Sequence, residues 1–246
     1  MRRRDAVDLA GGAWLGAWAA FVVVGLVVVG GGGAPLSIDS SLLSWSTGHR
    51  PGMAVATARV LTATGTGVVP YALVLVAGAV LGGTARTRTV AAGLGVACLV
   101  LGQAVRYGVM ELAARPRPPR QDWATYASGW SFPSGHTATS ALTAGLVILA
   151  IVLRAPRGRT ALCLAVGCWG VLVGLTRVYL GVHWFSDVIG GWLFAAGWLG
   201  LCGCAAAWWL PAGAVAAVAG RPDDSGPADE APGQEPPGGP PRTYSM

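Results

Sequence analysis

Six apolar runs dominate this chain of 246 residues, and each is long enough to cross a membrane as a helix. A hydrocarbon core about 30 Å thick requires roughly 20 apolar residues of helix. We expect the spans at about residues 11–33, 66–84, 89–112, 136–153, 160–179 and 185–210. Only 11% of the residues are charged, against roughly 25% in soluble domains, so an ordinary soluble fold is excluded. The predicted fold class is all-α, a six-helix transmembrane bundle spanning residues 11–210.

Arginines in the short connections predict the orientation of this bundle. They occur at Arg2, Arg3 and Arg4 before the first span, at Arg86 and Arg88 after the second, and at Arg154, Arg157 and Arg159 after the fourth. These three segments alternate so that they share one side, and the positive-inside rule assigns that side to the cytoplasm. We therefore expect a basic cytoplasmic N-terminus over residues 1–10, a cytoplasmic C-terminus, and outside loops after the first, third and fifth spans.

Two segments fall outside the predicted spans. Residues 35–65 mix apolar and polar positions and form an outer loop, for which we predict a short interfacial helix around residues 40–45. Residues 211–246 are rich in Pro, Gly and acidic side chains, a composition typical of disorder. We expect them to form a disordered cytoplasmic tail.

The distribution of charge and cysteine excludes several kinds of function. All 17 cationic side chains are Arg and the net charge is +6, but the arginines are scattered between apolar runs. This pattern favours lipid headgroups and anionic substrates over nucleic acid. The five cysteines all lie inside apolar runs, with no spacing typical of a zinc site or a disulfide framework. We expect neither a metal nor a cofactor, and no protein partner is identifiable.

Three polar blocks fall on the predicted outer side. They are "RPRPPR" at 115–120, "PSGH" at 133–136 and "TRVYLGVHWFSD" at 176–187. The first block is unexpected, because short outside loops usually avoid arginine. The topology rests only on the cytoplasmic segments, so the meeting of all three blocks on the opposite side is an independent observation. It indicates a functional site that needs positive charge.

Each block has a role to play in binding or transferring a phosphoryl group. Arginines bind phosphoryl oxygens in a bidentate manner. Ser134, Gly135 and His136 begin a predicted helix, where free backbone N–H groups attract an anion. His183 and Asp187 are four residues apart, so the carboxylate can orient the imidazole as a nucleophile. His136 can then protonate the leaving oxygen.

Each block alone is also typical of an ordinary structural role. A histidine at a membrane edge, an i,i+4 His–Asp contact, a basic loop and a helix start with Ser134 as N-cap are all common. Two of the only three histidines lie in these blocks, however, and we interpret the third, His49, as a plain loop residue. The joint occurrence favours the phosphoryl site.

With these blocks the chain resembles the type 2 phosphatidic acid phosphatase superfamily, which is related to vanadium haloperoxidases and class A acid phosphatases. The family pattern runs K-x6-R-P, then P-S-G-H, then S-R-x5-H-x3-D. Residues 133–136 match the second block, and Arg177, His183 and Asp187 match the third, with Thr176 in place of Ser. Arg117 and Pro118 match the R-P of the first block. The resemblance covers roughly residues 66–210, which would form the catalytic core, with an acid phosphatase/vanadium haloperoxidase-like fold and an outward-facing active site.

The resemblance implies a role for each matching residue. His183 would be the nucleophile that forms a phosphohistidine, Asp187 would orient it, and His136 would be the general acid and then activate water. Phosphoryl oxygens would be bound by Arg117, Arg177, Ser134 and Gly135. The family needs no metal.

One position departs from the family pattern. Met110 stands where the family has Lys, and Arg106 lies one helical turn earlier on the same face. We include Arg106 among the candidate phosphate-binding residues as a substitute for that Lys. The alternative is that Arg106 extends along the helix to the interface.

The sequence therefore predicts a multi-pass cell-membrane phosphatase acting on a lipid phosphomonoester or diphosphate at the extracytoplasmic face. Phosphatidate, phosphatidylglycerophosphate and polyprenyl diphosphate all remain open as substrates. A lipid-phosphate transporter or flippase would use the same arginines but would not need the His–Asp pair. A catalytically impaired lipid-binding homologue remains an alternative because of Met110. A haloperoxidase is disfavoured, because those enzymes are soluble.

Overall fold

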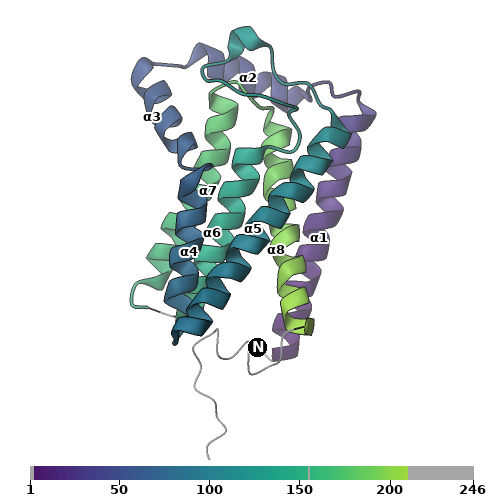
Figure 1. The fold of residues 1–246 in the computed structure, drawn as a ribbon. Coiled ribbons are helices and arrows are strands. Elements are labelled where there is room, and N and C mark those ends of the chain that lie inside the picture. Colours follow the sequence, from purple (N-terminus) through teal and green to yellow (C-terminus); the bar gives the residue numbers. More distant parts are fainter. Residues whose placement is uncertain (1–2, 155, 210–246) are drawn as a thin grey trace, which may run out of the picture.

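A computed structural model describes residues 3–154 and 156–209, and within them every element is helical (Figure 1). The helices are α1 (Arg3–Gly30), α2 (Ser37–Gly48), α3 (Gly52–Ala63), α4 (Val68–Leu81), α5 (Ala85–Ala113), the 3-10 turn η1 (Arg120–Asp122), α6 (Gly135–Arg154), α7 (Arg159–Tyr179) and α8 (Phe185–Trp209). The all-α prediction is confirmed for these residues. The predicted tail, residues 211–246, lies outside them.

Each predicted apolar run corresponds to one helix, and the bounds differ most for α1 and α4. Helix α1 begins at Arg3 rather than at residue 11, so most of the predicted N-terminal segment is helical. Its sequence, "RRDAVDLA", contains no Gly or Pro that would end a helix. Helix α4 is shorter than predicted, because Gly67 and Gly82 flank it.

Four helices are long and apolar enough to cross a membrane: α5, α6, α7 and the part of α8 from Phe185 to Ala206. Helices α3 and α4 together form a fifth candidate that is bent by 51°. The apolar part of α1, Trp14–Gly30, is shorter than these. Length and composition thus support four or five spans in the described residues, and the count of six stays a prediction.

The segment between α1 and α4 holds two helices where one was predicted. Helix α2 extends the expected interfacial helix in both directions and lies across the upper end of the bundle (Figure 1). Helix α3 was not predicted, because its 12 residues are too short for a span and mix small apolar, Thr and Arg side chains. Both helices belong to the same end of the molecule as the polar blocks.

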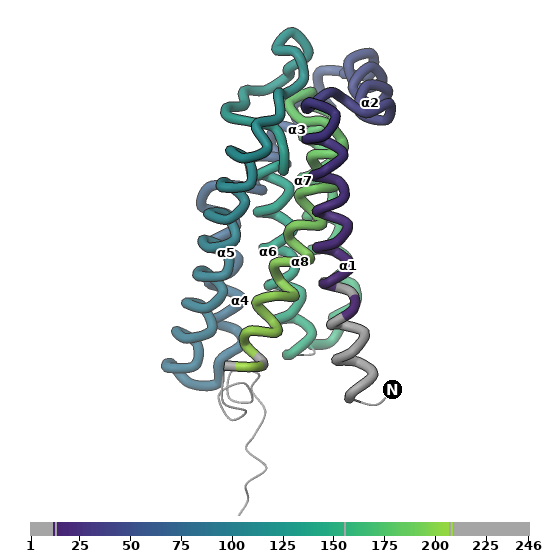
Figure 2. The backbone as a smooth tube through the Cα atoms, turned by 90° about the vertical axis from the view of Figure 1, so that its right-hand side faces the viewer, coloured from purple at the N-terminus to yellow at the C-terminus, as the bar shows by residue number. Residues whose placement is uncertain are grey.

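Helix α6 is central to the bundle and packs against α4, α5, α7 and α8, while α1 packs along α8 (Figure 2). The turns α4–α5 and α6–α7 lie at the lower end in Figure 1, and the α5–α6 and α7–α8 connections lie at the upper end with α2. This connectivity brings the three polar blocks together at one end. Large apolar side chains such as Val22, Leu26, Val76 and Leu101 are exposed on the outer surface, as expected for lipid-facing helices.

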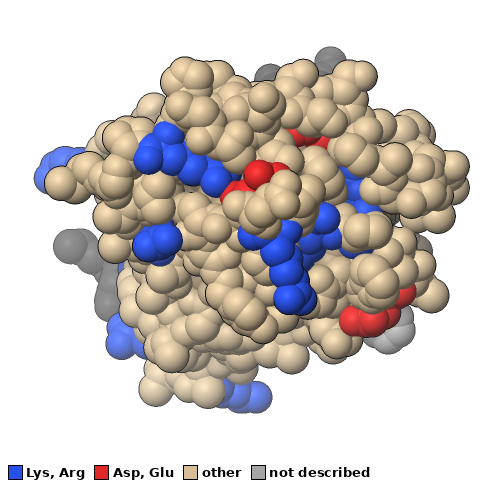
Figure 3. Space-filling view, turned by 90° about the horizontal axis from the view of Figure 1, so that it is seen from above, with Lys and Arg blue, Asp and Glu red and all other residues tan. Residues whose placement is uncertain are grey.

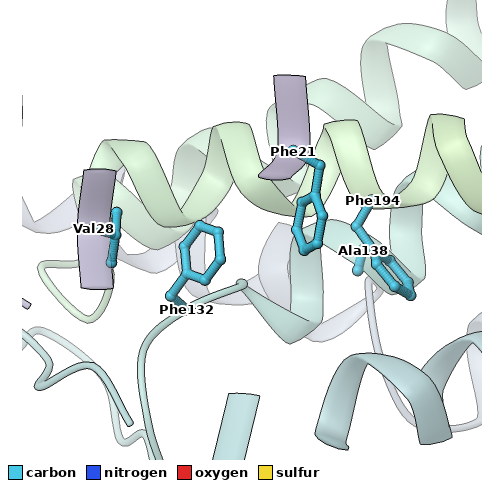
Figure 4. Close-up of a cluster of buried hydrophobic side chains, with 5 residues drawn as sticks. All are labelled: Phe21, Val28, Phe132, Ala138 and Phe194. Atoms are coloured by element: carbon cyan, nitrogen blue, oxygen red, sulfur yellow. The ribbon is translucent and has the colours of Figure 1, made fainter. Parts of the chain in front are cut away.

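A buried aromatic cluster positions the start of α6. It contains Phe21, Val28, Phe132, Ala138 and Phe194 (Figure 4). The Phe132 ring stacks on Phe21 with 5.8 Å between centroids and is 1% exposed. A methyl group at Gly190 of α8 would overlap the Phe132 ring, so only glycine permits this approach. Phe132 thereby fixes the backbone immediately before residues 133–136.

Candidate active site

A cavity of about 550 Å³ opens at the upper end of the bundle, where the three polar blocks meet. Its described lining is Thr66, Gln103, Arg106, Tyr107, Met110, Arg117, Tyr126, Ala127, Ser128, Gly129, Gly135, His136, Thr139, Arg177 and His183. This lining contains three arginines and two histidines but no acidic residue. The view of the molecule from above shows several arginine patches and fewer acidic ones (Figure 3). The cavity is therefore suited to a multiply charged anion.

His183 and Asp187 form a buried pair between the end of α7 and the first turn of α8. His183 Nδ1 lies 3.3 Å from Asp187 Oδ2. The same oxygen accepts the Trp184 N–H at 2.8 Å and the Ser131 hydroxyl, so the carboxylate is held on several sides. A carboxylate at Nδ1 favours the tautomer with its proton on that nitrogen. Nε2 then keeps a lone pair.

His183 is electrically neutral at neutral pH. Burial lowers the pKa of His183 from 6.5 to about 4, and the charges of Arg117 and Arg177 act in the same direction, although the hydrogen bond to Asp187 raises it. The pKa thus lies well below neutrality. The imidazole is available as a nucleophile rather than as an acid.

Arg117 is held in place by several hydrogen bonds, with its guanidinium beside His183. Its Nε and NH2 groups donate to the carbonyls of residues 128–130 at 2.8–2.9 Å. Its NH1 group donates to the Val182 carbonyl at 2.8 Å and lies 2.8 Å from His183 Nε2. A phosphoryl group approaching His183 would therefore meet a guanidinium whose position is already set.

Arg177 provides a second buried cation, from the last turn of α7. It is 2% exposed and donates from NH1 to Thr62 Oγ1 at 3.1 Å. Its buried Nε–H has no hydrogen-bond partner within residues 3–154 and 156–209. A buried N–H without a partner is costly unless a ligand accepts it. Arg177 lines the cavity, so a phosphoryl oxygen is a suitable acceptor.

The residues predicted at the start of α6 lie in two different places, some in the cavity wall and one buried behind it. Gly135 and His136 line the cavity, as expected for the start of α6. Ser134 does not line it: its side chain is buried and accepts the Thr137 hydroxyl at 2.9 Å. The Ser134 N–H donates to the Asp187 carbonyl at 3.1 Å. Ser134 thus ties α6 to α8, which differs from the predicted contact with phosphate.

His136 has a contact that the sequence did not predict. Its Nε2 lies 3.4 Å from the hydroxyl of Thr66, in the bend between α3 and α4. Thr66 also lines the cavity, but nothing in the local sequence marks it. His136 and His183 therefore share one cavity, each with its own oxygen neighbour.

Arg106 reaches the cavity, as the spacing from Met110 predicts. Its Nε donates to Gln103 Oε1 at 2.8 Å, and its NH1 lies 3.5 Å from Met110 Sδ. A Cβ on Gly135 would lie 3.4 Å from the Arg106 guanidinium carbon, so this cation rests against the start of α6. Arg106 therefore occupies the neighbourhood expected for the missing Lys.

Sequence reasoning missed two charged residues behind the His–Asp pair. Arg115, in the first polar block, is fully buried, and its NH1 lies 2.6 Å from Asp187 Oδ1. Its NH2 lies 2.9 Å from Asp39 Oδ2, in the first turn of α2. In the sequence, Asp39 is notable only as an acidic residue in a chain that has few of them.

No group of three or more His, Cys, Asp or Glu side chains is placed to hold a metal ion in residues 3–154 and 156–209. The chemistry that this part of the chain offers comes from its imidazoles, guanidinium groups and one oriented carboxylate.

Comparison with known proteins confirms the predicted resemblance. The model of the PAP2 superfamily matches residues 96–210, which include every predicted site residue. Phosphatidylglycerophosphatase B of Bacillus subtilis (strain 168) is 38% identical over 77 residues, covering 29% of this chain and 38% of that protein. Undecaprenyl-diphosphatase of Sulfolobus acidocaldarius is 34% identical over 106 residues, covering 41% and 46%. Lipid A 1-phosphatase of Rhizobium etli is 42% identical over 76 residues, covering 31% and 29%.

These matches span less than half the length of each of those relatives. A solved structure gives a longer match: the crystal structure of a transmembrane PAP2-type phosphatidylglycerolphosphate phosphatase from Bacillus subtilis. It has a TM-score of 0.66 and 20% identity, and the match covers 80% of this chain and 97% of that one. At this identity the likeness shows the shared fold.

Proposed function

We propose that the protein is a membrane phosphatase. The basis is that residues 96–210 match the PAP2 superfamily. It hydrolyses a phosphomonoester or diphosphate of a lipid through a phosphohistidine at His183. The observation that carries the proposal is one acid-free cavity shared by His183, His136 and three arginines, with Asp187 behind His183.

The proposed reaction has two displacements. His183 Nε2 attacks phosphorus and the bond from phosphorus to the leaving oxygen breaks. His136 enters this step as its imidazolium form and gives that oxygen a proton. The Nδ1 proton stays in its hydrogen bond with Asp187, whose negative charge stabilises the positive ring. Water then attacks phosphorus while His136 takes a proton from it, the P–N bond breaks, and phosphate leaves.

The arginines stabilise the charge that develops on the phosphoryl oxygens. The free Nε–H of Arg177 is available for this role, and Arg117 would contribute by exchanging its contact with His183 Nε2 for one with a phosphoryl oxygen. Gly135 offers a backbone N–H at the start of α6, and Arg106 lies against it. No metal ion is required in this scheme.

The site faces the extracytoplasmic side in this proposal, and both termini are cytoplasmic. Arg86, Arg88, Arg154, Arg157 and Arg159 lie in or beside the two lower turns, at the end away from the cavity (Figure 1). Positive charge at that end favours a cytoplasmic location, with six spans in all. A lipid headgroup at the outer interface would then reach the cavity without leaving the bilayer.

The named substrates of the relatives differ, namely phosphatidylglycerophosphate, undecaprenyl diphosphate and the 1-phosphate of lipid A by their titles. The lipid therefore stays open between monoesters and diphosphates. A transporter of lipid phosphates is less well supported, because transport does not require an imidazole oriented by a buried carboxylate.

Phosphate release tests the proposal directly. Detergent-purified protein is incubated with phosphatidate, phosphatidylglycerophosphate and a polyprenyl diphosphate, with and without EDTA. We expect phosphate from at least one lipid, unchanged by EDTA, and none from His183→Ala at equal expression. Full activity in His183→Ala contradicts the phosphohistidine, and loss of activity in EDTA contradicts the metal-free scheme.

A further inference from the structure

A buried polar network joins α2 to the reacting pair. Arg115 bridges two carboxylates: NH1 lies 2.6 Å from Asp187 Oδ1, and NH2 lies 2.9 Å from Asp39 Oδ2. The side chains of Arg115, Asp39 and Asp187 have no exposed surface. Asp39 lies far from the other two in sequence and outside the segment matched by the family model.

Ser186 closes this network into a ring. Its N–H donates to Asp39 Oδ1 at 2.8 Å and its hydroxyl donates to Asp39 Oδ2 at 2.6 Å. The same hydroxyl accepts Arg115 NH1 at 2.8 Å. Ser186 directly precedes Asp187, so Asp39 holds the backbone that carries the reacting carboxylate. Asp39 also accepts the Leu36 N–H at 3.0 Å, which fixes it to the start of its own helix.

The charges in this network have a direct consequence for His183. One guanidinium is shared by two carboxylates, so the buried group of three carries one net negative charge. Arg115 also forms an ion pair with Asp39, so it neutralises the charge of Asp187 only in part. Asp187 therefore remains a strong hydrogen-bond acceptor for the His183 Nδ1–H. When His183 becomes positively charged during phosphoryl transfer, the group of four becomes neutral overall. A buried cluster favours that neutral state.

We propose that Asp39 is a positioning residue for phosphoryl transfer: through Arg115 and Ser186 it fixes Asp187 and keeps that carboxylate available to the His183 imidazole. Asp39 is not among the residues that line the cavity. Its effect therefore falls on the reactivity of His183 rather than on substrate binding.

The decisive variant is Asp39→Asn, which keeps the shape of the side chain and removes its charge. Its kinetic readout rests on the proposed phosphatase activity, and we expect kcat to fall about tenfold, or roughly 1.4 kcal/mol. KM should change by less than about twofold, because no cavity residue is altered. The matched control is Glu111→Gln, an exposed carboxylate on α5 near the same end, which should leave kcat and KM unchanged.

A second readout does not require activity. The Nδ1 proton resonance of His183 reports the strength of its hydrogen bond with Asp187, and the chain has only three histidines to assign. In protein with isotope-labelled histidine, we expect this resonance to move upfield in Asp39→Asn and to stay in place in Glu111→Gln. A residue that merely supports the fold would lower the melting temperature without moving this resonance.

The outcomes separate cleanly. Unchanged kcat and an unchanged His183 resonance in folded Asp39→Asn overturn the proposal. Should the wild-type protein release no phosphate from any lipid, the proposed function fails, and the resonance alone decides the link from Asp39 to His183. Should Asp39→Asn not fold, Ser186→Ala decides in its place, because it removes the hydroxyl between Asp39 and Arg115. A shift in the same direction supports the proposal, and no shift overturns it.

Discussion

In the proposed mechanism, burial on one side and Asp187 on the other would set the reactivity of His183. Burial and the nearby arginines keep the ring neutral, while Asp187 holds its Nδ1–H and directs Nε2 toward Arg117. The sequence predicts this pair because its two members are one helical turn apart. It does not predict Thr66 or Asp39, because their partners lie far away in the chain and no local pattern connects them.

The pH dependence of the free enzyme should reflect this neutral His183. Because burial lowers the pKa of His183 from 6.5 to about 4, its deprotonated, reactive form persists as the pH falls through 6.5. As far as this residue is concerned, kcat/KM should fall only as the pH approaches 4. Below the folded pKa the protonated ring has no lone pair for attack.

Asp187→Asn provides the test of this pH dependence. The hydrogen bond to Asp187 raises the pKa of His183, so its loss should move the acid limb to still lower pH while kcat falls. Profiles of kcat/KM against pH are measured for wild type, Asp187→Asn and the control Glu111→Gln. If kcat/KM of the wild type fell with a midpoint near pH 6.5, the pKa of His183 would not be lowered by burial.

Arg106 lies beside Met110, where the family pattern has Lys. If Arg106 supplies the charge of the missing Lys, Arg106→Ala should weaken transition-state binding by roughly 1–3 kcal/mol, as for a charged hydrogen bond. Met110→Lys should restore much of this loss in the double variant, because both side chains project from one face of α5. The measurement is kcat/KM for both single variants and the double variant. Wild-type activity in Arg106→Ala at equal expression would show that Arg106 only reaches toward the interface.

At the scale of elements, apolar length and connecting residues were enough to predict α1 and α4–α8. The free energy of moving a long apolar segment out of water depends on its composition, which can be read from the sequence. Helix α3 was not predicted because neither its length nor its composition distinguishes it from a loop. Helix α1 was predicted too short because the expected span excludes its charged N-terminal residues, whereas charged residues do not end a helix. Packing between helices was also beyond the sequence, since it depends on close approaches such as Gly197 against Trp18.

Gly190 tests whether such a close approach positions the site. Gly190→Ala places a methyl group into the Phe132 ring, and overpacking of this kind costs about 1–3 kcal/mol. The matched control is Gly203→Ala in the same helix, where nothing lies within 4 Å. This control should leave stability unchanged or raise it by about 0.5–1 kcal/mol through helix propensity. Melting temperatures in detergent distinguish the two, and equal values would show that Phe132 moves without cost.

At the scale of the whole molecule, the charge distribution along the bundle axis matches the arrangement of its connections. Both lower turns, α4–α5 and α6–α7, carry arginines that have no role in the cavity, while the upper end carries the three polar blocks. The sequence predicts this separation because spans alternate in direction. The fold adds the reason for arginine in the predicted outer loop: Arg115 and Arg117 are held within the protein by buried or backbone partners.

Sidedness is the last prediction and follows from that separation. Ser128 lies at the cavity mouth and is exposed, and Gly83 lies in the opposite α4–α5 turn and is exposed. Cysteine placed at each position should react differently with a membrane-impermeant thiol reagent. We expect Ser128→Cys to be labelled in intact cells and Gly83→Cys only after permeabilisation, because the arginines beside Gly83 favour the cytoplasm. The unsubstituted chain measures the background from its five native cysteines. Labelling of Gly83→Cys in intact cells, with Ser128→Cys protected, would place the cavity on the cytoplasmic side and reverse the proposed orientation.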